Sequence, residues 1–184
     1  ENVIPKLINN ESVICVSQTG TGKTLTFALP ISELVKRIED EEGLGQRKSQ
    51  PYAVIVAPTK ELAMQIHAVF KSISHHVKLR VRTLISTTKS KASLKNQSYE
   101  ILIATPTKLA RAIKKEEVVM SQLKFLVFDE ADNLFEMGFK KDIENILYPV
   151  KYDNTDIHFF SATMPLEVED YLNKKFERKS LNKV

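Results

Sequence analysis

The octapeptide S-Q-T-G-T-G-K-T at residues 17–24 combines two glycines, a lysine and a hydroxyl residue in the order typical of phosphate-binding loops. Gly20 and Gly22 can adopt positive φ, which lets backbone N–H groups approach a phosphate. Lys23 would reach the terminal phosphates of a nucleotide, and the Thr24 hydroxyl would hold Mg²⁺. The predicted nucleotide-binding residues are Ser17, Gln18, Thr19, Gly20, Thr21, Gly22, Lys23 and Thr24.

Ser17 stands where the usual pattern has its first glycine. At the exit of a strand this position mainly has to be small, so we expect the loop to work with serine. The apolar run at 12–16 and the helical pattern that begins near Lys23 supply the strand and helix that such a loop joins. The alternative is a glycine-rich turn that binds no ligand.

A second stretch with chemical potential is F-L-V-F-D-E-A-D, residues 125–132, in which an apolar strand ends on carboxylates. Ligands of open α/β sheets bind at the carboxyl ends of the strands. Asp129 is predicted to hold Mg²⁺ through water, and Glu130 to orient or deprotonate an attacking water. A nucleophilic water indicates hydrolysis, because a kinase uses a substrate hydroxyl instead. The predicted catalytic residues are Lys23, Asp129 and Glu130, and the alternative is a solvated acidic strand end.

The elements that must position these residues alternate along the chain. Continuous apolar runs predict strands at 12–16, 52–57, 81–86, 100–105, 124–129 and 158–163. Amphipathic patterns predict helices at 23–39, 60–74, 107–115, 133–147 and 166–175, with loops at 40–51 and 87–98. Alternation of this kind predicts an α/β fold, a doubly wound parallel sheet with helices on both faces.

Bulk properties favour one globular domain in the 184 residues. Cys15 is the only cysteine and lies in a buried apolar run, which fits a reducing intracellular compartment. The four histidines, two of them adjacent, do not form a convincing metal site. No apolar run reaches the ~20 residues that cross a bilayer. The net charge of +4 is compatible with a polyanionic partner without demanding one.

The motifs together resemble the DEAD-box family of RNA helicases. Residues 129–132 spell D-E-A-D, and the other matching segments are P-T-K-E-L-A-M-Q at 58–65, A-T-P-T-K-L at 104–109, D-N-L-F-E-M-G-F at 132–139 and S-A-T at 161–163. The similarity extends from about residue 4 to about residue 171. It implies a RecA-like domain that binds ATP and Mg²⁺, and an enzyme that couples ATP hydrolysis to RNA binding and local unwinding.

The resemblance also implies roles for residues outside the nucleotide loop. Residues at two strand ends would bind the RNA sugar-phosphate backbone without reading bases: Pro58, Thr59, Lys60, Glu61, Thr105, Pro106 and Lys108. Thr59 and Thr105 also look like helix N-caps, and both roles can hold at once. A third group would link the state of the nucleotide to domain closure: Asp132, Ser161, Ala162 and Thr163. Ser161 and Thr163 would bond the carboxylates of the D-E-A-D segment.

The chain departs from the family at several positions. Lys60 and Lys108 replace arginines, which keeps the charge but loses the bidentate fork. Thr107 replaces a glycine, and the family's paired glycines are missing near Ser86, Thr87 and Thr88. This spelling is similar to the branch of the family that processes small-subunit ribosomal RNA.

The resemblance places an adenine-reading glutamine element upstream of residue 1 and a second RecA-like domain, with arginine fingers, downstream. We therefore expect residues 1–176 to form the first domain and 177–184 to begin the interdomain linker. The expected partners are RNA and the second domain of the same chain, with no membrane association and a monomeric state. Nucleolus, nucleus, cytoplasm and mitochondrion all remain open. The alternative functions are a non-catalytic, ATP-dependent RNA clamp and a small-molecule kinase.

Overall fold

The computed structural model describes residues 3–18, 20, 22–42, 48–85, 94–176 and 181–184 of the chain. Its strands form one seven-stranded sheet in the order β3-β4-β2-β5-β6-β1-β7, and every pairing within this sheet is parallel. The strands are β1 (Val13–Val16), β2 (Ala53–Val56), β3 (Val81–Leu84), β4 (Ile101–Ala104), β5 (Phe125–Phe128), β6 (Asp156–Ser161) and β7 (Asn182–Lys183). All residues of the central strands β2, β4 and β5 are buried, which explains their unbroken apolar sequences.

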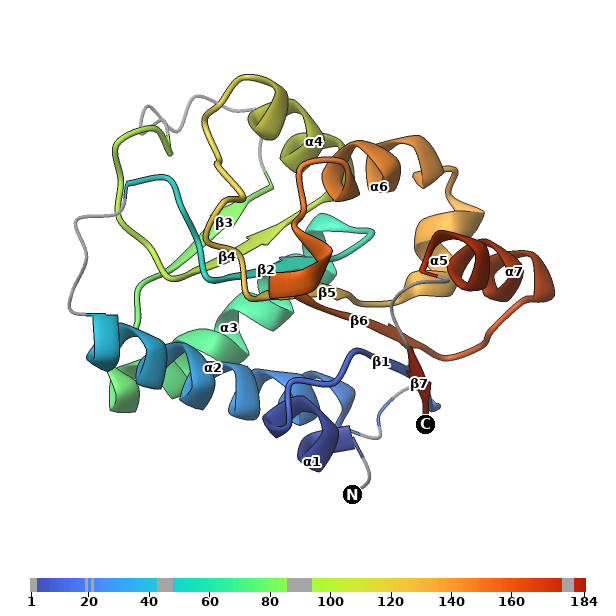
Figure 1. The fold of residues 1–184 in the computed structure, drawn as a ribbon, viewed down its shortest axis with the longest axis horizontal. Helices are drawn as coiled ribbons and strands as arrows, with labels where there is room; N and C mark the ends of the chain where they lie inside the picture. The colour runs from blue at the N-terminus through green and yellow to red at the C-terminus, as the bar shows by residue number, and fades with distance from the viewer. Residues whose placement is uncertain (1–2, 19, 21, 43–47, 86–93, 177–180) are drawn as a thin grey trace.

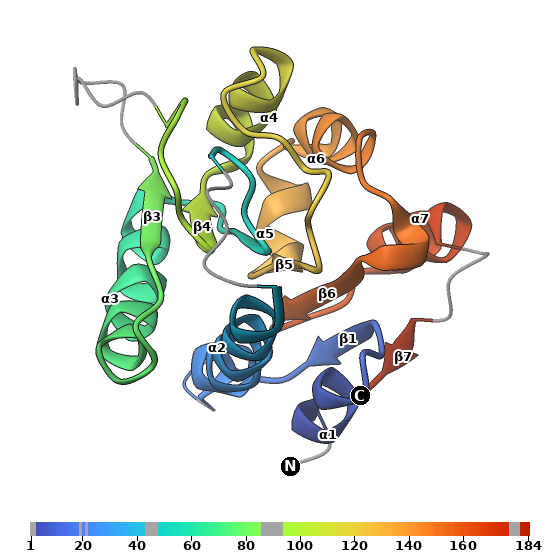
Figure 2. The ribbon, with the colours of Figure 1, turned by 60° about the vertical axis from the view of Figure 1, so that its left-hand side comes forward.

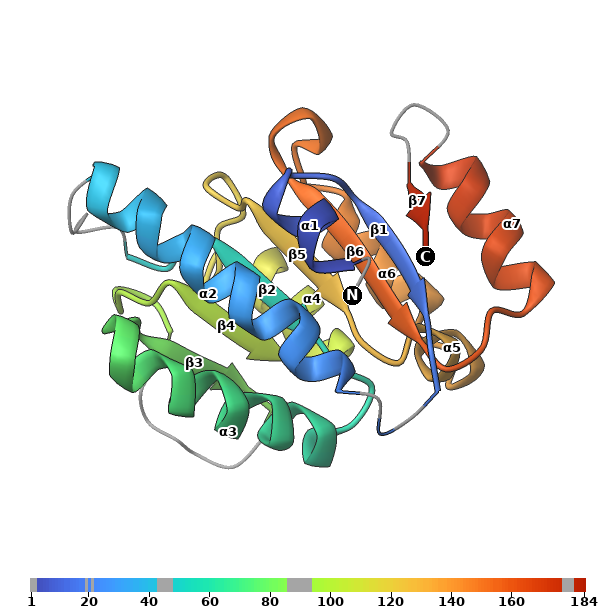
Figure 3. The ribbon, with the colours of Figure 1, turned by 90° about the horizontal axis from the view of Figure 1, so that it is seen from below.

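Helices cover both faces of this sheet, as Figures 1 and 3 show. One face carries α1 (Val3–Ile8), α2 (Lys23–Glu42) and α3 (Lys60–Val77). The other carries α4 (Pro106–Lys114), α5 (Ala131–Glu136), α6 (Lys140–Leu147) and α7 (Leu166–Lys175). Successive strand residues point to opposite faces, so Phe159 packs in the core beneath α4–α7 and Phe160 in the core beneath α1–α3. The predicted doubly wound α/β fold is confirmed.

The predicted helix at 133–147 is wrong, because two helices, α5 and α6, occupy this stretch. Gly138 between them has φ +80°, a conformation that ends a helix. The N–H groups of Gly138 and Phe139 donate to the carbonyls of Phe135 and Leu134, at 3.0 and 3.1 Å. The break turns α6 away from α5 and toward α4 (Figure 1).

Other differences from the expected elements are smaller. Helix α2 extends to Glu42, into the predicted loop 40–51, and β6 begins two residues earlier than predicted. Three short elements were not predicted: α1, the 3-10 turn at Tyr152–Asn154, and β7, which pairs with β1 as the outermost strand of the sheet. Residues 43–47 and 87–93 of the predicted loops, the last residue of the predicted strand 81–86, and residues 177–180 of the predicted linker lie outside the described residues. No helix in the described ranges is long and apolar enough to cross a bilayer.

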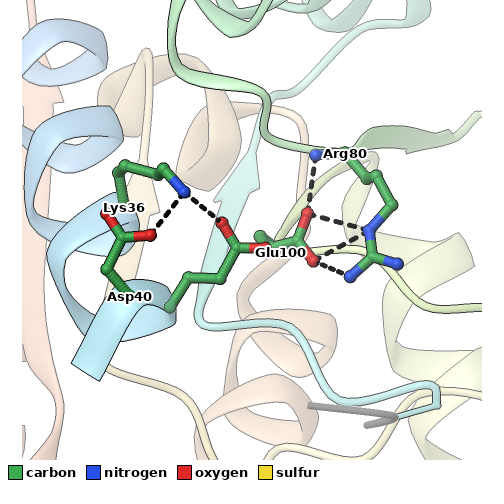
Figure 4. A network of polar contacts seen from close by, with 5 residues as sticks. Lys36, Asp40, Arg80 and Glu100 are labelled. Atoms are coloured by element: carbon green, nitrogen blue, oxygen red, sulfur yellow. Dashed lines mark hydrogen bonds and ion pairs between the residues drawn. The ribbon is translucent and has the colours of Figure 1, made fainter. Parts of the chain in front are cut away.

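Two groups of charged contacts lie near the end of the sheet opposite the strand carboxyl ends (Figure 4). Glu100, buried at the start of β4, accepts hydrogen bonds from the backbone N–H (2.6 Å) and Nε (2.9 Å) of Arg80. On α2, Lys36 donates to Asp40 at 2.6 Å and to the buried Glu39 at 3.3 Å. The Arg80–Glu100 pair fixes the edge strand β3 beside β4, because Arg80 immediately precedes β3.

Candidate functional site

The parallel strands bring the predicted site residues that the structure describes to the carboxyl ends of the strands, along one edge of the sheet, which Figure 2 shows from another side. β1, β6 and β5 are neighbours, and their carboxyl ends lead into Ser17, Ser161 and Asp129. β2 and β4 are neighbours on the other side of β5, and they lead into the predicted RNA segments at Thr59 and Thr105. The predicted nucleotide residues therefore occupy one half of the edge and the predicted RNA residues the other half.

The glycines of the loop adopt the backbone conformation that a phosphate-binding loop requires. Gly20 and Gly22 have φ values of +81° and +83°. No atom lies within 4 Å of the place that a Cβ would take at either position, so the need for glycine is conformational, not steric. Helix α2 begins at Lys23, which directs its free N–H groups toward the loop. Gln18 is exposed, Thr24 is half-buried, and Thr19 and Thr21 lie outside the described residues.

The side chain of Lys23 lies between the ends of β1 and β6. Its Nζ donates to the backbone carbonyls of Ser17, at 2.5 Å, and of Ser161, at 3.3 Å. The same Ser161 carbonyl accepts the backbone N–H of Ser17 at 3.0 Å. These contacts of Ser17 use backbone atoms, which explains why serine can stand in place of the pattern's first glycine.

Asp129 is 3% exposed at the end of β5, and its Oδ1 accepts the backbone N–H of Glu130 at 3.0 Å. Burial raises the pKa of the Asp129 carboxyl to about 6, and the N–H of Glu130 and the charge of Lys23 offset this only in part. A carboxylate whose charge is disfavoured in this way would be stabilised by a cation. Together with the Thr24 hydroxyl, it offers the oxygen ligands that Mg²⁺ prefers.

Glu130 has φ 48° and ψ 54°, a left-handed conformation that is uncommon for any residue except glycine. It is the N-cap of α5, and its Oε2 accepts Nδ2 of Asn133 at 2.8 Å. Left-handed conformations of non-glycine residues cluster at functional sites. Asn133 was not among the predicted site residues, although a side chain three residues after an N-cap commonly reaches back to the cap.

Three of the four predicted coupling residues are joined by hydrogen bonds. Oδ2 of Asp132 accepts the hydroxyl of Thr163 at 2.8 Å and its backbone N–H at 2.9 Å. Oγ of Ser161 accepts the backbone N–H of Asp132 at 3.0 Å. Partial burial raises the pKa of Asp132, but the hydrogen bonds from Thr163 and Ser161 outweigh it and leave the pKa below its ordinary value. Ala162, the fourth, lies half-buried between its neighbours.

Thr59 and Thr105 both precede helices, but they use their hydroxyls differently. Thr59 Oγ1 accepts the backbone N–H of Leu62 at 3.1 Å, so Thr59 is an N-cap as predicted. The Thr105 side chain makes no capping bond to the described first turn of α4, which begins at Pro106, one residue earlier than predicted. The Thr105 hydroxyl is therefore not committed to its helix.

The other predicted RNA residues differ in accessibility. Lys60 and Glu61 are exposed, and Lys108 is half-buried. Pro58 and Pro106 are buried, so they shape the turns and cannot offer their rings to a strand of RNA.

Thr107, which replaces a family glycine, has a partner on another helix. Its hydroxyl donates to Oδ2 of Asp142 on α6 at 2.6 Å. The hydrogen bond joins the first turn of α4 to the first turn of α6, so this departure from the family pattern is structural. The positions of the missing glycine pair, Ser86 to Thr88, lie outside the described residues.

The sequence of the chain is similar to those of known helicases. The profile of the family described as DEAD/DEAH box helicase matches residues 1–171. The chain is 32% identical to DEAD-box ATP-dependent RNA helicase 39 of Arabidopsis thaliana, over 95% of the chain and 30% of that protein. It is 36% identical to ATP-dependent RNA helicase ROK1 of Saccharomyces cerevisiae, over 91% of the chain and 30% of the relative. The chain thus spans about a third of the length of these curated relatives.

Solved structures of similar proteins share the fold. A DEAD box protein from Methanococcus jannaschii superposes with a TM-score of 0.81 at 32% identity, covering 98% of this chain and 47% of that one. A hypothetical ATP-dependent RNA helicase from Sulfolobus tokodaii gives a TM-score of 0.81 at 28% identity, covering 100% of this chain and 51% of that one. With its D-E-A-D carboxylates and S-A-T segment hydrogen-bonded at the sheet edge, the chain belongs to the DEAD/DEAH box helicase family.

Proposed function

We propose that this chain is the first RecA-like domain of an ATP-dependent RNA helicase, which couples ATP hydrolysis to RNA binding and local duplex unwinding. The observation that carries the proposal is the division of one sheet edge into two halves. The ends of β1, β5 and β6 carry Lys23, Asp129 and Ser161, and the ends of β2 and β4 carry Thr59 and Thr105.

The nucleotide half has the charges that a triphosphate and its metal need. Lys23 would exchange its carbonyl partners for phosphate oxygens, and the N–H groups around Gly20 and Gly22 would bind the same anion. Thr24 and Asp129 would hold Mg²⁺, which supplies charge neutralisation to the phosphates. These assignments rest on the loop geometry and on the buried, unfavourably charged Asp129.

Glu130 is the residue of this chain that would activate water. Asn133 and the cap position hold its carboxylate beside Asp129, where it can accept a proton from a water molecule. A clamp that only holds RNA has no need of this carboxylate or of the contacts between Asp132 and Thr163. The residues therefore favour an enzyme over a non-catalytic clamp.

The RNA half would bind the strand through its sugar-phosphate backbone. Lys60 is exposed and Lys108 half-buried, and the Thr105 hydroxyl is available. Contacts of this type position a strand without reading its sequence. Lysines here would act as point charges, so each contact is less directional than one made by arginine.

A second RecA-like domain would complete both halves. The solved relatives cited above are about twice as long as the matched chain, which is consistent with a second domain of similar size. We propose that the whole protein acts as a monomer that closes around ATP and RNA, with ribosomal RNA as the substrate class that the P-T-K-E-L-A spelling favours.

Calorimetric titration of the 184-residue chain with MgATP, followed by a steady-state ATPase assay with and without RNA, tests the proposal. We expect weak nucleotide binding that Lys23→Ala abolishes. Turnover should stay below ~1 s⁻¹, because an arginine finger from another domain is worth roughly 10³–10⁵ in rate. Absence of binding at millimolar MgATP would refute the nucleotide site. Phosphate transfer from ATP to a small acceptor would identify a kinase instead.

A further inference from the structure

A groove lies between α4 and α6, on the outer side of the helix layer. The two helices lie side by side in Figures 1 and 2. The groove encloses about 470 Å³ and is lined by residues of both helices and of the turn after α6. We call it the α4–α6 groove and define it by Arg111, Ile113, Lys114, Lys141, Asn145 and Tyr148.

The charge along this groove is predominantly positive. Arg111, Lys114 and Lys141 line it and are exposed, and among the described residues none of them forms an ion pair. The single acidic residue of the lining, Asp142, already accepts the Thr107 hydroxyl at 2.6 Å. Unpaired cations in a groove are the electrostatic footprint of a polyanion.

The cations continue those of the proposed RNA half. Lys108 and Arg111 are at i and i+3 on α4, so they lie on one side of the helix, and Lys115 follows as its C-cap residue. Lys114 is next to them, at the edge that borders the groove. A nine-residue helix is about 14 Å long, which matches about four phosphates of a stacked strand spaced ~3.4 Å apart.

The end of the groove presents an aromatic ring. Tyr148, at the carboxyl end of α6, is 91% exposed, and it is the most exposed of the large hydrophobic residues that the structure describes. Pro149 beside it and Ile113 across the groove give the site an apolar floor. Exposed aromatic rings next to cations are the platforms on which proteins stack the bases of single strands.

We propose that the α4–α6 groove is a second contact surface for single-stranded RNA, which continues the strand beyond the sheet edge toward Tyr148. The inference rests on the RNA-binding function proposed above. Phosphates would lie against Arg111, Lys114 and Lys141, and one base would stack on the Tyr148 ring. An acidic polypeptide would use the same charges, but continuity with Lys108 on the same helix favours RNA.

Fluorescence anisotropy with a labelled 16-nucleotide oligoadenylate in about 50 mM salt tests this inference on the 184-residue chain. The triple variant R111A/K114A/K141A should bind at least about tenfold more weakly, and the slope of log K against log salt should fall by up to about 2. Tyr148→Ala should weaken binding about fivefold or more, whereas Tyr148→Phe, which keeps the ring, should leave it within about twofold. The charge-matched control K151A/K174A/K175A changes exposed lysines outside the groove and should have a much smaller effect than the groove triple.

Lys108→Ala separates the two proposals. If Lys108→Ala weakens RNA binding while R111A/K114A/K141A weakens it no more than the control variant does, the groove inference is wrong. The proposal that RNA binds at the ends of β2 and β4 is then still supported. If the unmodified chain does not bind the oligoadenylate even at low salt, the proposed RNA function fails. Equal losses for Tyr148→Ala and Tyr148→Phe would overturn the stacking contact. Circular dichroism melts confirm that each variant is folded.

Discussion

Thr163 donates two hydrogen bonds to one carboxylate oxygen of Asp132, from its hydroxyl at 2.8 Å and from its backbone N–H at 2.9 Å. This contact connects the segment after β6 with the first turn of α5, two parts of the chain that are 31 residues apart. Together with the hydrogen bond from the backbone N–H of Asp132 to Ser161 Oγ, it links the S-A-T and D-E-A-D segments directly.

Thr163→Val should remove the hydroxyl contact and keep the backbone one. Because the site is open to solvent, we expect a loss of about 1 kcal/mol in the free energy of unfolding, measured by urea denaturation. Thr163→Ser keeps the hydroxyl and should be close to the unmodified chain. In a double-mutant cycle with Asp132→Ala, the two losses should not add. Simple additivity would show that the contact contributes nothing to stability.

Asp129→Asn should stabilise the metal-free chain at neutral pH. Burial raises the pKa of Asp129 from the ordinary 3.8 to about 6, so the folded state takes up a proton more readily than the unfolded state. The loss of stability caused by ionising Asp129 in the folded chain is therefore absent below pH 3.8, grows between pH 3.8 and 6, and is complete above pH 6. At 1.36 kcal/mol per pKa unit, this loss in the free energy of unfolding is about 3 kcal/mol at pH 7.5.

Urea unfolding in EDTA at pH 7.5 and at about pH 4 measures how the gain in the free energy of unfolding of Asp129→Asn over the unmodified chain depends on pH. The amide keeps the acceptor for the Glu130 N–H, so the part of the difference that changes with pH reports the charge of Asp129. The gain should be present at pH 7.5 and nearly absent at the acidic pH. An equal gain at both values would mean that packing, not ionisation, produces it.

Glu130→Gly and Glu130→Ala should differ in stability although both remove the carboxylate. At φ 48° an alanine keeps the steric strain of the left-handed conformation, whereas glycine relieves it. We expect the glycine variant to be more stable than the alanine variant by about 1 kcal/mol in thermal or urea unfolding. A more stable alanine variant would contradict strain at this position.

Lys23→Met should abolish MgATP binding, while Ser17→Gly should leave the affinity within about twofold. The lysine would supply the charge, whereas the observed contacts of Ser17 with Lys23 and Ser161 use its backbone atoms, which glycine also has. Titration of both variants with a fluorescent ATP analogue provides the comparison. A large loss for Ser17→Gly would assign the serine hydroxyl a role in the loop.

Thr107→Val should destabilise the chain by about 1–2 kcal/mol, because it removes a hydrogen bond to a charged partner, Asp142, at 2.6 Å. Thr107→Ser restores the donor and should recover most of the loss in urea unfolding. A valine variant more stable than the serine variant would show that the side-chain methyl, not the hydrogen bond, fixes α4 against α6.

The sequence predicted the parallel sheet because each buried strand is a continuous apolar run, as in β2 and β5. It did not predict β7, whose two residues have no pattern of their own and are held by pairing with β1. Helix α1 has only six residues, and its stability comes from burying Val3 and Leu7, a tertiary effect.

Motifs along the chain predicted candidate site residues but could not give their contacts. Glu130 with Asn133 is local, and helix spacing could have suggested it. The contacts of Thr107 with Asp142 and of Lys23 with the Ser161 carbonyl join distant segments, so they depend on how helices and strands pack. The break at Gly138 was readable in principle, because glycine commonly ends a helix.

Ser161 forms hydrogen bonds with three residues of the nucleotide half. Its carbonyl accepts the backbone N–H of Ser17 and Nζ of Lys23, and its hydroxyl accepts the backbone N–H of Asp132. Thermodynamic linkage then imposes a reciprocity on the protein. If a ligand at Lys23 changes the affinity of a partner that binds Asp132 and Thr163, that partner must change the affinity for the ligand by the same factor. A tenfold effect in one direction therefore requires a tenfold effect in the other, which corresponds to a coupling free energy of about 1.4 kcal/mol.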